Sequence, residues 1–398
     1  MTSPYQVPTT DCVVCETDVP AGAFCGFCGS HLVPQRADGP PWLRLRAFGA
    51  APGEHVLRPA VASSLFPHLH HRSRAPFRLG LILLLVALVV FAVLRWQAPL
   101  VAVSALGLPV LFHLYLYDIN AYKDLPRSAL LLIAVVSACL GVGWAWLTGE
   151  IIARGYTVAF GSSTEFTNPV WEAVVIPVSG AIIMVIPIVV ARLSRVGTRE
   201  SLDGFLIGAV GAMIFTAAAT LTQLAPQFST GLIASDRPIT VLVDEAGIRG
   251  VAMSLTAAAA GGMVGAALWF TRPDPAHQLR GQWLASPPPA LGLALIAYAA
   301  LGFTDASSVA ETWQLVIHLS VAVVIVLGLR IVVHMALLRE AHDPITQEPF
   351  LCENCGEVVP DMAFCPACGL ATRASSRSSR AERRRARPVL VNPPPERL

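Results

Sequence analysis

Eight of the nine cysteines in this 398-residue chain form two units with the same spacing, one near each end. Each unit holds two CxxC pairs, and together they offer four thiolates, the donor set of a tetrahedral Zn²⁺ site. Four cysteines leave no open coordination position, so we predict two structural zinc ions rather than catalytic ones. The predicted ligands are Cys12, Cys15, Cys25 and Cys28 in the first unit and Cys352, Cys355, Cys365 and Cys368 in the second.

Two other chemistries use the same cysteines. Iron in a rubredoxin-like site takes the same four ligands, and the sequence does not separate Fe from Zn. Disulfides require an oxidising compartment, and the N-terminus MTSPYQVPTTDC lacks the basic and apolar regions of a secretory signal. We therefore favour a metal. His31 could replace a ligand in the first unit, but we favour a solvated histidine.

The residues after the CxxC pairs predict tight turns. Gly29, Gly356 and Gly369 each follow the second cysteine of a pair, where a positive φ lets the next N–H groups turn toward sulfur. Glu16 stands at the remaining position, so that turn is expected to be less favourable. Over about 20 residues at each end, the units resemble the zinc ribbons of bacterial membrane and regulatory proteins.

The chain between the units is apolar enough to lie in a bilayer. Overall, 54% of its residues are hydrophobic and 14% are charged, against about 25% charged in soluble proteins. Spans of about 20 apolar residues cross a bilayer, so we predict an all-α polytopic membrane protein with eight spans. They are expected at 79–95, 99–117, 128–148, 170–191, 203–225, 250–270, 288–304 and 312–336.

The short loops predict the orientation. Lys and Arg are more frequent in alternate loops, beginning with Arg72, Arg74 and Arg78 before the first span, and such loops face the cytoplasm. Eight spans then place both termini and both cysteine units in the cytoplasm. We expect a multi-pass protein of the inner or plasma membrane, and the abundance of Ala, Pro, Arg and Gly suggests a bacterial source. The prediction depends on the seventh span, which Gly302 interrupts.

Composition divides the chain into five parts. A zinc ribbon at 1–31 is followed by a linker rich in Pro, Arg and His at 32–76. The transmembrane domain at 77–340 precedes a second ribbon at 350–371. The tail at 372–398 is rich in Arg, Ser and Pro, and we predict that it is disordered. Its arginines could attract anionic lipid, at about 1 kcal/mol each.

Ionisable residues inside spans are candidate functional positions, because burying them in lipid is costly. We expect His113 and His318 to lie deepest and to bond a neighbouring helix rather than a metal or a proton path. Arg330 is placed where it can extend its charge to the interface. The full set is His113, Glu172, Asp203, His318, Arg330 and His334, with Gln223 as a polar neighbour.

The region from 169 to 270 resembles the PrsW-type intramembrane metalloproteases. That family has an EExxK motif, a helix that opens with DG and ends FxxxE, and a later helix with histidine. Glu172, Asp203-Gly204 and Phe215 occupy the corresponding positions. The resemblance implies a membrane-embedded zinc peptidase fold. However, Ala173 and Ile176 replace the second glutamate and the lysine of the first motif, and Ala219 replaces the glutamate of the second. The 250–270 span also contains no histidine, so the resemblance is to an inactive relative.

These observations favour a non-enzymatic membrane scaffold whose cytosolic ribbons and basic tail recruit a soluble protein. Nucleic acid is the less favoured partner, because a nucleic-acid-binding ribbon is basic and the second unit carries Glu353, Glu357 and Asp361. Two alternatives remain open. An intramembrane peptidase would have to use Glu172, His113 and His318, and a small-molecule transporter or channel would depend on Asp203, Gln223 or Glu172.

Overall fold

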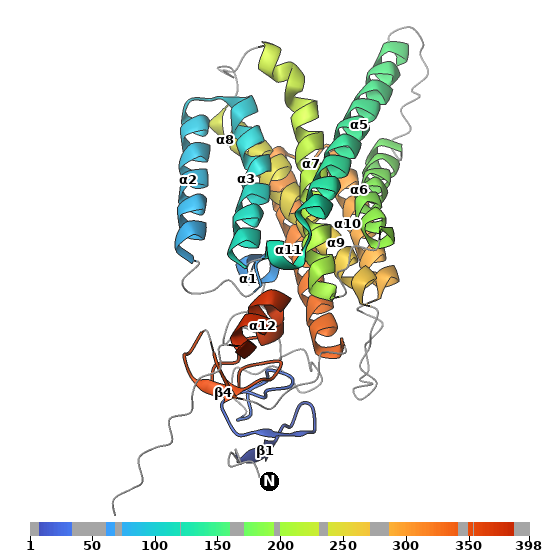
Figure 1. Ribbon diagram of the computed structural model, residues 1–398. Coiled ribbons are helices and arrows are strands. Elements are labelled where there is room, and N and C mark those ends of the chain that lie inside the picture. The colour runs from blue at the N-terminus through green and yellow to red at the C-terminus, as the bar shows by residue number, and fades with distance from the viewer. Residues whose placement is uncertain are drawn as a thin grey trace, which may run out of the picture.

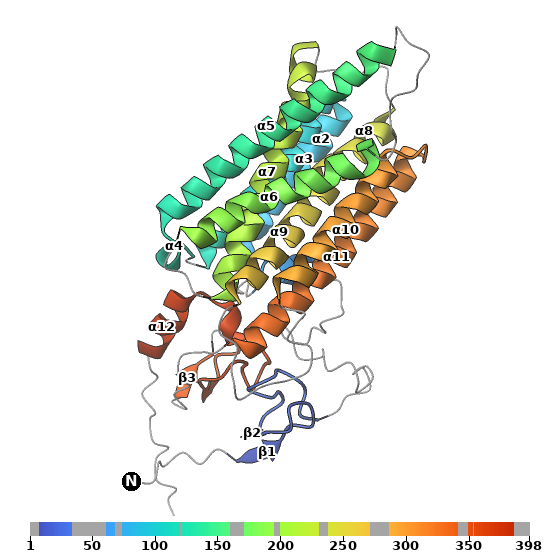
Figure 2. The same ribbon diagram turned by 90° about the vertical axis from the view of Figure 1, so that its right-hand side faces the viewer.

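A bundle of long helices stands on a small base formed by the two cysteine units (Figures 1 and 2). Within the described residues, eight helices are long and apolar enough to cross a membrane, which confirms the predicted all-α polytopic fold. This computed structural model describes residues 8–33, 61–67, 74–119, 121–159, 171–194, 200–230, 238–270, 286–340, 349–352 and 354–385. Most of the predicted linker and the last part of the tail lie outside these ranges.

The spanning helices follow the order of the predicted spans, and the uncertain seventh span is a continuous helix, Pro287–Asp305. Six spans are single helices: α2 Arg74–Val93, α3 Gln97–Asp118, α5 Arg127–Ala159, α7 Ser201–Thr230, α10 Pro287–Asp305 and α11 Glu311–Arg339. The fourth span begins with a π-helical segment, η2 Trp171–Val175, and continues as α6 Ile176–Leu193. The sixth span consists of α8 Ile239–Ala246, the π-helical η3 Gly247–Ala252 and α9 Met253–Trp269. A short helix α4, Ala121–Asp124, lies between α3 and α5.

The sixth span starts earlier than predicted. We expected a loop up to residue 249, but the helix begins at Ile239. The charged residues in this stretch are accommodated because neighbouring helices bond them: Thr312 Oγ1 donates to Asp244 Oδ2 at 2.8 Å, and Gln97 Nε2 donates to Glu245 Oε2 at 2.6 Å. The expected loop between 226 and 249 is therefore corrected, because residues from 239 onward belong to the sixth span.

The centre of the bundle is the pair α7 and α9, whose small residues let the two backbones touch. A Cβ added to Gly208 would lie 2.1 Å from the carbonyl oxygen of Gly261, and one on Gly265 would lie 2.1 Å from that of Gly204. Real Cβ atoms do not approach that closely, so only glycine fits at these positions. The other helices surround this pair, and α2 lies at the outside of the bundle, with none of residues 75–93 buried.

Part of the predicted linker packs into the bundle. Helix α1, Val61–Leu65, places the side chain of Leu65 fully inside the core. The Arg330 guanidinium on α11 is also buried and donates to Ser63 Oγ at 2.8 Å and to Ser64 Oγ at 3.3 Å. Arg330 therefore does not extend to the interface as expected, because the two α1 hydroxyls solvate it inside the protein.

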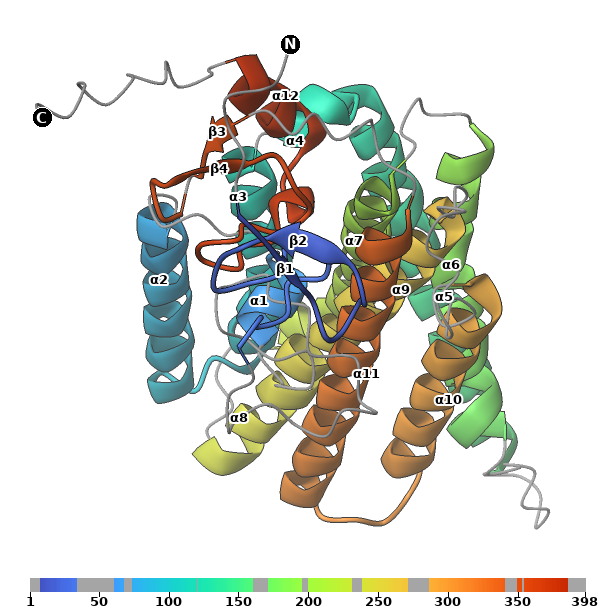
Figure 3. The same ribbon diagram turned by 90° about the horizontal axis from the view of Figure 1, so that it is seen from below.

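Each cysteine unit contains one two-stranded antiparallel sheet. In the first unit, β1 Thr9–Asp11 pairs with β2 Asp18–Pro20, and in the second, β3 Pro349–Leu351 pairs with β4 Val358–Pro360. Both units lie at the same end of the bundle, side by side beneath it (Figure 3). We call this the cysteine end, and its location agrees with an even number of spans.

The beginning of the tail is folded, which corrects the prediction of disorder from residue 372. A 3-10 turn, η6 Thr372–Ala374, leads into helix α12, Arg377–Arg385. Figure 1 shows α12 between the bundle and β4. Residues 386–398 lie outside the described ranges. A nine-residue arginine-rich helix is too short to be stable alone in water, so its order has to come from contacts with the rest of the chain.

Candidate metal centres and the docked arginine helix

In each unit, the four cysteine sulfur atoms lie close enough together to bind one metal ion. Within each unit the four Sγ atoms all lie within 4.8 Å of one another. The Sγ–Sγ distances are 3.7 Å for Cys12–Cys28 and 3.6 Å for Cys15–Cys25. In the second unit they are 3.7 Å for Cys352–Cys368 and 3.9 Å for Cys355–Cys365.

A tetrahedron of Zn–S bonds of about 2.3 Å has edges of roughly 3.8 Å, so both cages match this ion in size. A ferrous or ferric ion with four thiolates has similar dimensions and fits the same cages. The structure thus shows two four-cysteine groups able to hold metal ions, formed by the eight predicted ligands. His31 is not a member of the first group and instead contacts the Phe24 ring at a tilt of 37°, with ring centroids 4.4 Å apart.

The turns around the sulfur atoms are equivalent in the two units. The backbone N–H of Gly369 donates to the carbonyl of Cys365 at 2.8 Å, and that of Glu16 donates to the carbonyl of Cys12 at 2.8 Å. The three predicted glycines have φ between 72° and 73°, and Glu16 has φ 55°. Glu16 is therefore the one residue of these four turns with a side chain in the left-handed region, as the sequence predicted.

The crowded thiols influence one another's protonation. Hydrogen bonds from Cys15, Cys25 and Cys28 lower the pKa of the Cys12 thiol, while the contact with Cys12 raises the pKa of Cys28. One thiolate in such a cluster makes a second one costly unless a cation is present. A metal that takes all four thiolates therefore has to displace protons, and metal binding is linked to pH.

The two cysteine units pair with each other. The backbone N–H of Phe24 donates to the carbonyl of Pro366 at 2.9 Å, and that of Phe364 donates to the carbonyl of Gly26 at 2.9 Å. These residues are equivalent in the two units, so the contact is reciprocal, like an interface between identical subunits. A Cβ added to Gly369 would lie 2.7 Å from the Phe24 ring, so the two units touch closely.

Three carboxylates gather at the start of α7, at the cysteine end. Glu340, the residue after α11, accepts hydrogen bonds from the backbone N–H of Ser201 at 3.0 and 3.1 Å. Glu200 precedes α7, and Asp203 lies in its first turn with its side chain buried. The N–H groups at the start of a helix have no partner within the helix, and they favour negative charge nearby. Nevertheless, burial raises the pKa of Glu340 to about 7.

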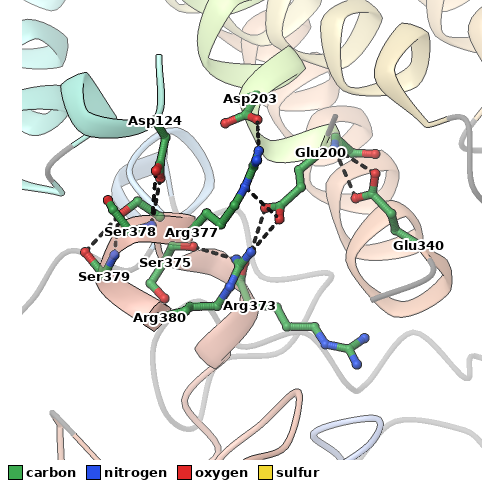
Figure 4. A network of polar contacts seen from close by, with 12 residues as sticks. Asp124, Glu200, Asp203, Glu340, Arg373, Ser375, Arg377, Ser378, Ser379 and Arg380 are labelled. Atoms are coloured by element: carbon green, nitrogen blue, oxygen red, sulfur yellow. Dashed lines mark hydrogen bonds and ion pairs between the residues drawn. The ribbon is translucent and has the colours of Figure 1, made fainter. Parts of the chain in front are cut away.

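The arginines of α12 neutralise this group (Figure 4). Arg380 Nη2 donates to both oxygens of Glu200, at 2.6 and 2.7 Å. Arg377 Nη2 donates to Asp203 Oδ2 at 3.1 Å, and its Nε lies 3.4 Å from Glu200. Arg380 thus contacts both oxygens of one carboxylate and Arg377 bridges two carboxylates, and such charge-assisted hydrogen bonds are stronger than neutral ones. At least these two tail arginines are therefore engaged by the protein itself rather than by lipid.

Two further contacts hold α12 in place. The carboxylate of Asp124 on α4 accepts the backbone N–H of Ser378 at 3.0 and 3.1 Å, which caps the start of the helix. Arg384 Nε donates to Asp361 Oδ2 in the second cysteine unit at 2.7 Å. Helix α12 thus joins the membrane bundle to the second cysteine unit.

The predicted membrane residues do not form one site. Glu172 lies in η2 and His318 near the start of α11, both toward the end of the bundle opposite the cysteine end, whereas His113 and Asp203 lie toward the cysteine end. His334 is buried within α11, and Gln223 is exposed on α7.

The two histidines that the sequence placed deepest, His113 and His318, have different surroundings. His318 is fully buried, with Nδ1 2.9 Å from the Gln314 carbonyl and Nε2 3.3 Å from Asp305 on α10. His113 is exposed and bonds the Tyr122 hydroxyl through Nδ1 at 2.8 Å. The expectation that His113 lies deep is corrected, because α3 ends only five residues later, at Asp118.

Comparison of the chain with protein-family models, with curated proteins and with solved structures found no significant match. The resemblances drawn from motifs therefore assign no family. Sequence reasoning missed the carboxylates Asp124, Glu200 and Glu340, although an arginine-rich segment in a chain with so few charges was a signal to search for acidic partners.

Proposed function

We propose that this protein is a non-enzymatic membrane anchor whose two zinc-stabilised units form a rigid platform for a soluble protein at the cytoplasmic face. The observation that carries the proposal is the attachment of the platform. The units bond each other reciprocally through Phe24 and Phe364, and α12 ties the second unit to α7. Contact surfaces held this firmly to a bundle suit the docking of a partner at a fixed distance from the membrane.

The distribution of ionisable residues also supports a non-enzymatic role. A metallopeptidase needs histidine and carboxylate ligands around one ion, together with a base for the attacking water. Glu172 precedes the start of α6 and His113 lies near the end of α3, at opposite ends of the bundle. Ala219 occupies the position where the resemblance to the peptidases would require glutamate. Closed four-thiolate sites are structural rather than catalytic, which favours zinc as a folding element here.

The test is crosslinking in cells followed by purification in mild detergent and mass spectrometry. In the variant Cys352→Ser/Cys355→Ser, the second unit should lose its metal and unfold while the bundle remains inserted. Proteins crosslinked to the wild type should then be at least about tenfold depleted, because a structural zinc site supplies the folding energy of such a unit.

Cys139→Ser is the matched control, since Cys139 lies on α5 outside both cysteine groups. It should keep the full set of crosslinked proteins. Recovery of the same proteins from Cys352→Ser/Cys355→Ser would contradict recruitment by the platform.

A further inference from the structure

A cavity of about 440 Å³ lies between α3, α4, α5 and α7 at the cysteine end. Its volume is within the range of ligand-binding pockets, about 300–1,000 Å³. The apolar part is lined by Ala134 on α5 and by Val210 and Ile214 on α7. The cavity is open on the outer surface of the bundle, where Leu131 on α5 and Tyr117 on α3 are 68% and 75% exposed. We call it the α3–α5 groove.

One end of the groove is polar. His113, Tyr122 and Arg127 line it there, and the Tyr122 hydroxyl lies 2.8 Å from His113 Nδ1. Burial raises the pKa of the Tyr122 phenol, so the hydroxyl keeps its proton and remains a donor. Arg127, at the first residue of α5, is exposed and supplies a permanent positive charge.

The polar end coincides with the edge of the membrane-spanning region. Tyr122 lies on α4 between two spans, and Arg127 is the first residue of the third span. The apolar lining continues from there along α5 and α7 into the spans. A ligand that matches a basic, hydrogen-bonding end followed by an apolar lining has an anionic headgroup and a hydrocarbon chain. The lipid bilayer around the groove contains such molecules.

We propose that the α3–α5 groove binds one anionic glycerophospholipid. Its phosphate contacts Arg127 and the Tyr122 hydroxyl, and an acyl chain lies over Ala134, Val210 and Ile214. Arginine binds phosphate through parallel N–H donors, and the tyrosine ring suits the boundary between headgroup and chain. This site is separate from the arginines of α12, and it does not depend on the proposed recruitment of a soluble partner.

The experiment is a lipid titration of the full-length protein in detergent, followed by native mass spectrometry. The probes are phosphatidylglycerol and phosphatidylcholine with the same acyl chains. The wild type should bind the first phosphatidylglycerol about fivefold more tightly than phosphatidylcholine, the effect of about one basic residue near a headgroup. Arg127→Gln should remove that preference, and Tyr122→Phe should weaken it.

Arg78→Gln is the matched control, because Arg78 is an exposed arginine on α2 at the same end of the bundle but outside the groove. It should leave the preference unchanged. Ala134→Phe should fill the apolar part and weaken both lipids equally, and an excess of soluble glycerol phosphate should not displace the bound lipid. Each variant is compared by size-exclusion profile and melting temperature, so that loss of folding is recognised.

Three results would overturn the proposal. The first is equal binding of the two lipids by the wild type. The second is an equal loss of preference in Arg78→Gln and Arg127→Gln, which is the behaviour of unspecific lipid around the bundle. The third is displacement of the lipid by glycerol phosphate, which would mean that the phosphate alone is recognised.

Discussion

At the scale of single residues, the position after each CxxC pair decides how easily a turn closes around the metal. Gly29, Gly356 and Gly369 adopt positive φ without cost, whereas Glu16 holds a side chain at φ 55°. In the left-handed region, a non-glycine residue destabilises the fold by roughly 1–2 kcal/mol. Replacing it with glycine recovers only part of this free energy, because glycine loses more conformational entropy on folding.

Glu16→Gly is therefore expected to stabilise the metal-bound first unit by about 1 kcal/mol. The measurement is the concentration of a competing chelator needed to remove the first metal from the purified protein. That concentration should rise about fivefold, because 1.4 kcal/mol corresponds to a factor of ten in an equilibrium constant.

Gly356→Ala provides the reverse test at the equivalent position of the second unit. Gly356 has φ 73°, and an added Cβ would meet nothing within 4 Å. The substitution therefore raises only the free energy of the backbone conformation and creates no steric clash. We expect weaker metal retention in the second unit. If both substitutions left retention unchanged, the left-handed conformation would not limit these turns.

At the scale of elements, α12 is ordered by carboxylates that belong to other helices. Its N-terminus is capped by Asp124 from α4, and its arginines reach Glu200 and Asp203 at the start of α7. These acidic groups would repel one another at the helix start without a basic partner. The helix and the carboxylates therefore stabilise each other, and neither part is expected to keep this arrangement alone.

Arg377→Gln/Arg380→Gln should release α12 from the bundle. Hydrogen bonds to charged groups contribute about 1.5–3 kcal/mol, so the amides of residues 377–385 should exchange with deuterium at least about tenfold faster. The measurement is hydrogen exchange with mass spectrometry on the detergent-purified protein. Arg385→Gln is the matched control, because Arg385 is an exposed arginine at the far end of the same helix.

The effect should grow with pH. The pKa of Glu340 is raised to about 7 in the folded protein, so its protonated form is favoured there. Its stabilising contribution is present below its ordinary pKa of 4.5 and is lost as pH rises through 7. The arginines then offset more negative charge at pH 8 than at pH 6. Equal exchange in the double variant and the wild type at pH 8 would contradict docking by these ion pairs.

At the scale of the whole molecule, the two cysteine units behave as halves of one platform. Phe24 and Phe364 exchange backbone hydrogen bonds with the opposite unit, and the Phe24 ring lies against Gly369. Two hydrogen bonds at about 1 kcal/mol each, together with this packing, are enough to link the stability of the two metal sites.

Cys12→Ser/Cys15→Ser should therefore weaken the second metal site as well as removing the first. We expect two zinc ions in the wild type and one in the variant, with the remaining ion released to a chromogenic chelator about tenfold faster. Elemental analysis and the rate of release provide the measurements.

Cys139→Ser should keep both ions and the slow release of the wild type. An unchanged rate of release from the second site of the double variant would mean that the two units fold independently. The reciprocal contact through Phe24 and Phe364 would then be too weak to couple them.

Local features of the sequence were sufficient for the eight metal-site cysteines and the eight spans. Cysteine spacing determines which sulfur atoms can share an ion, and the length of an apolar run determines whether a helix crosses a bilayer. Both properties lie within a few tens of residues. The seventh span is a continuous helix that includes Gly302. An added Cβ there would lie 2.2 Å from Pro177 Cγ and 2.3 Å from the Ala173 carbonyl oxygen, so this glycine permits close packing rather than interrupting the span.

Only the tertiary structure decided the contacts between distant segments. Arg377 and Arg380 of α12 pair with carboxylates more than 170 positions earlier in the chain. Arg330 is buried against hydroxyls from α1, more than 260 positions away. Composition describes such arginines as solvated or disordered, because it contains no information about the charges that surround them in space. The free energy of a charged side chain depends on its partners and its burial, and the fold alone determines both.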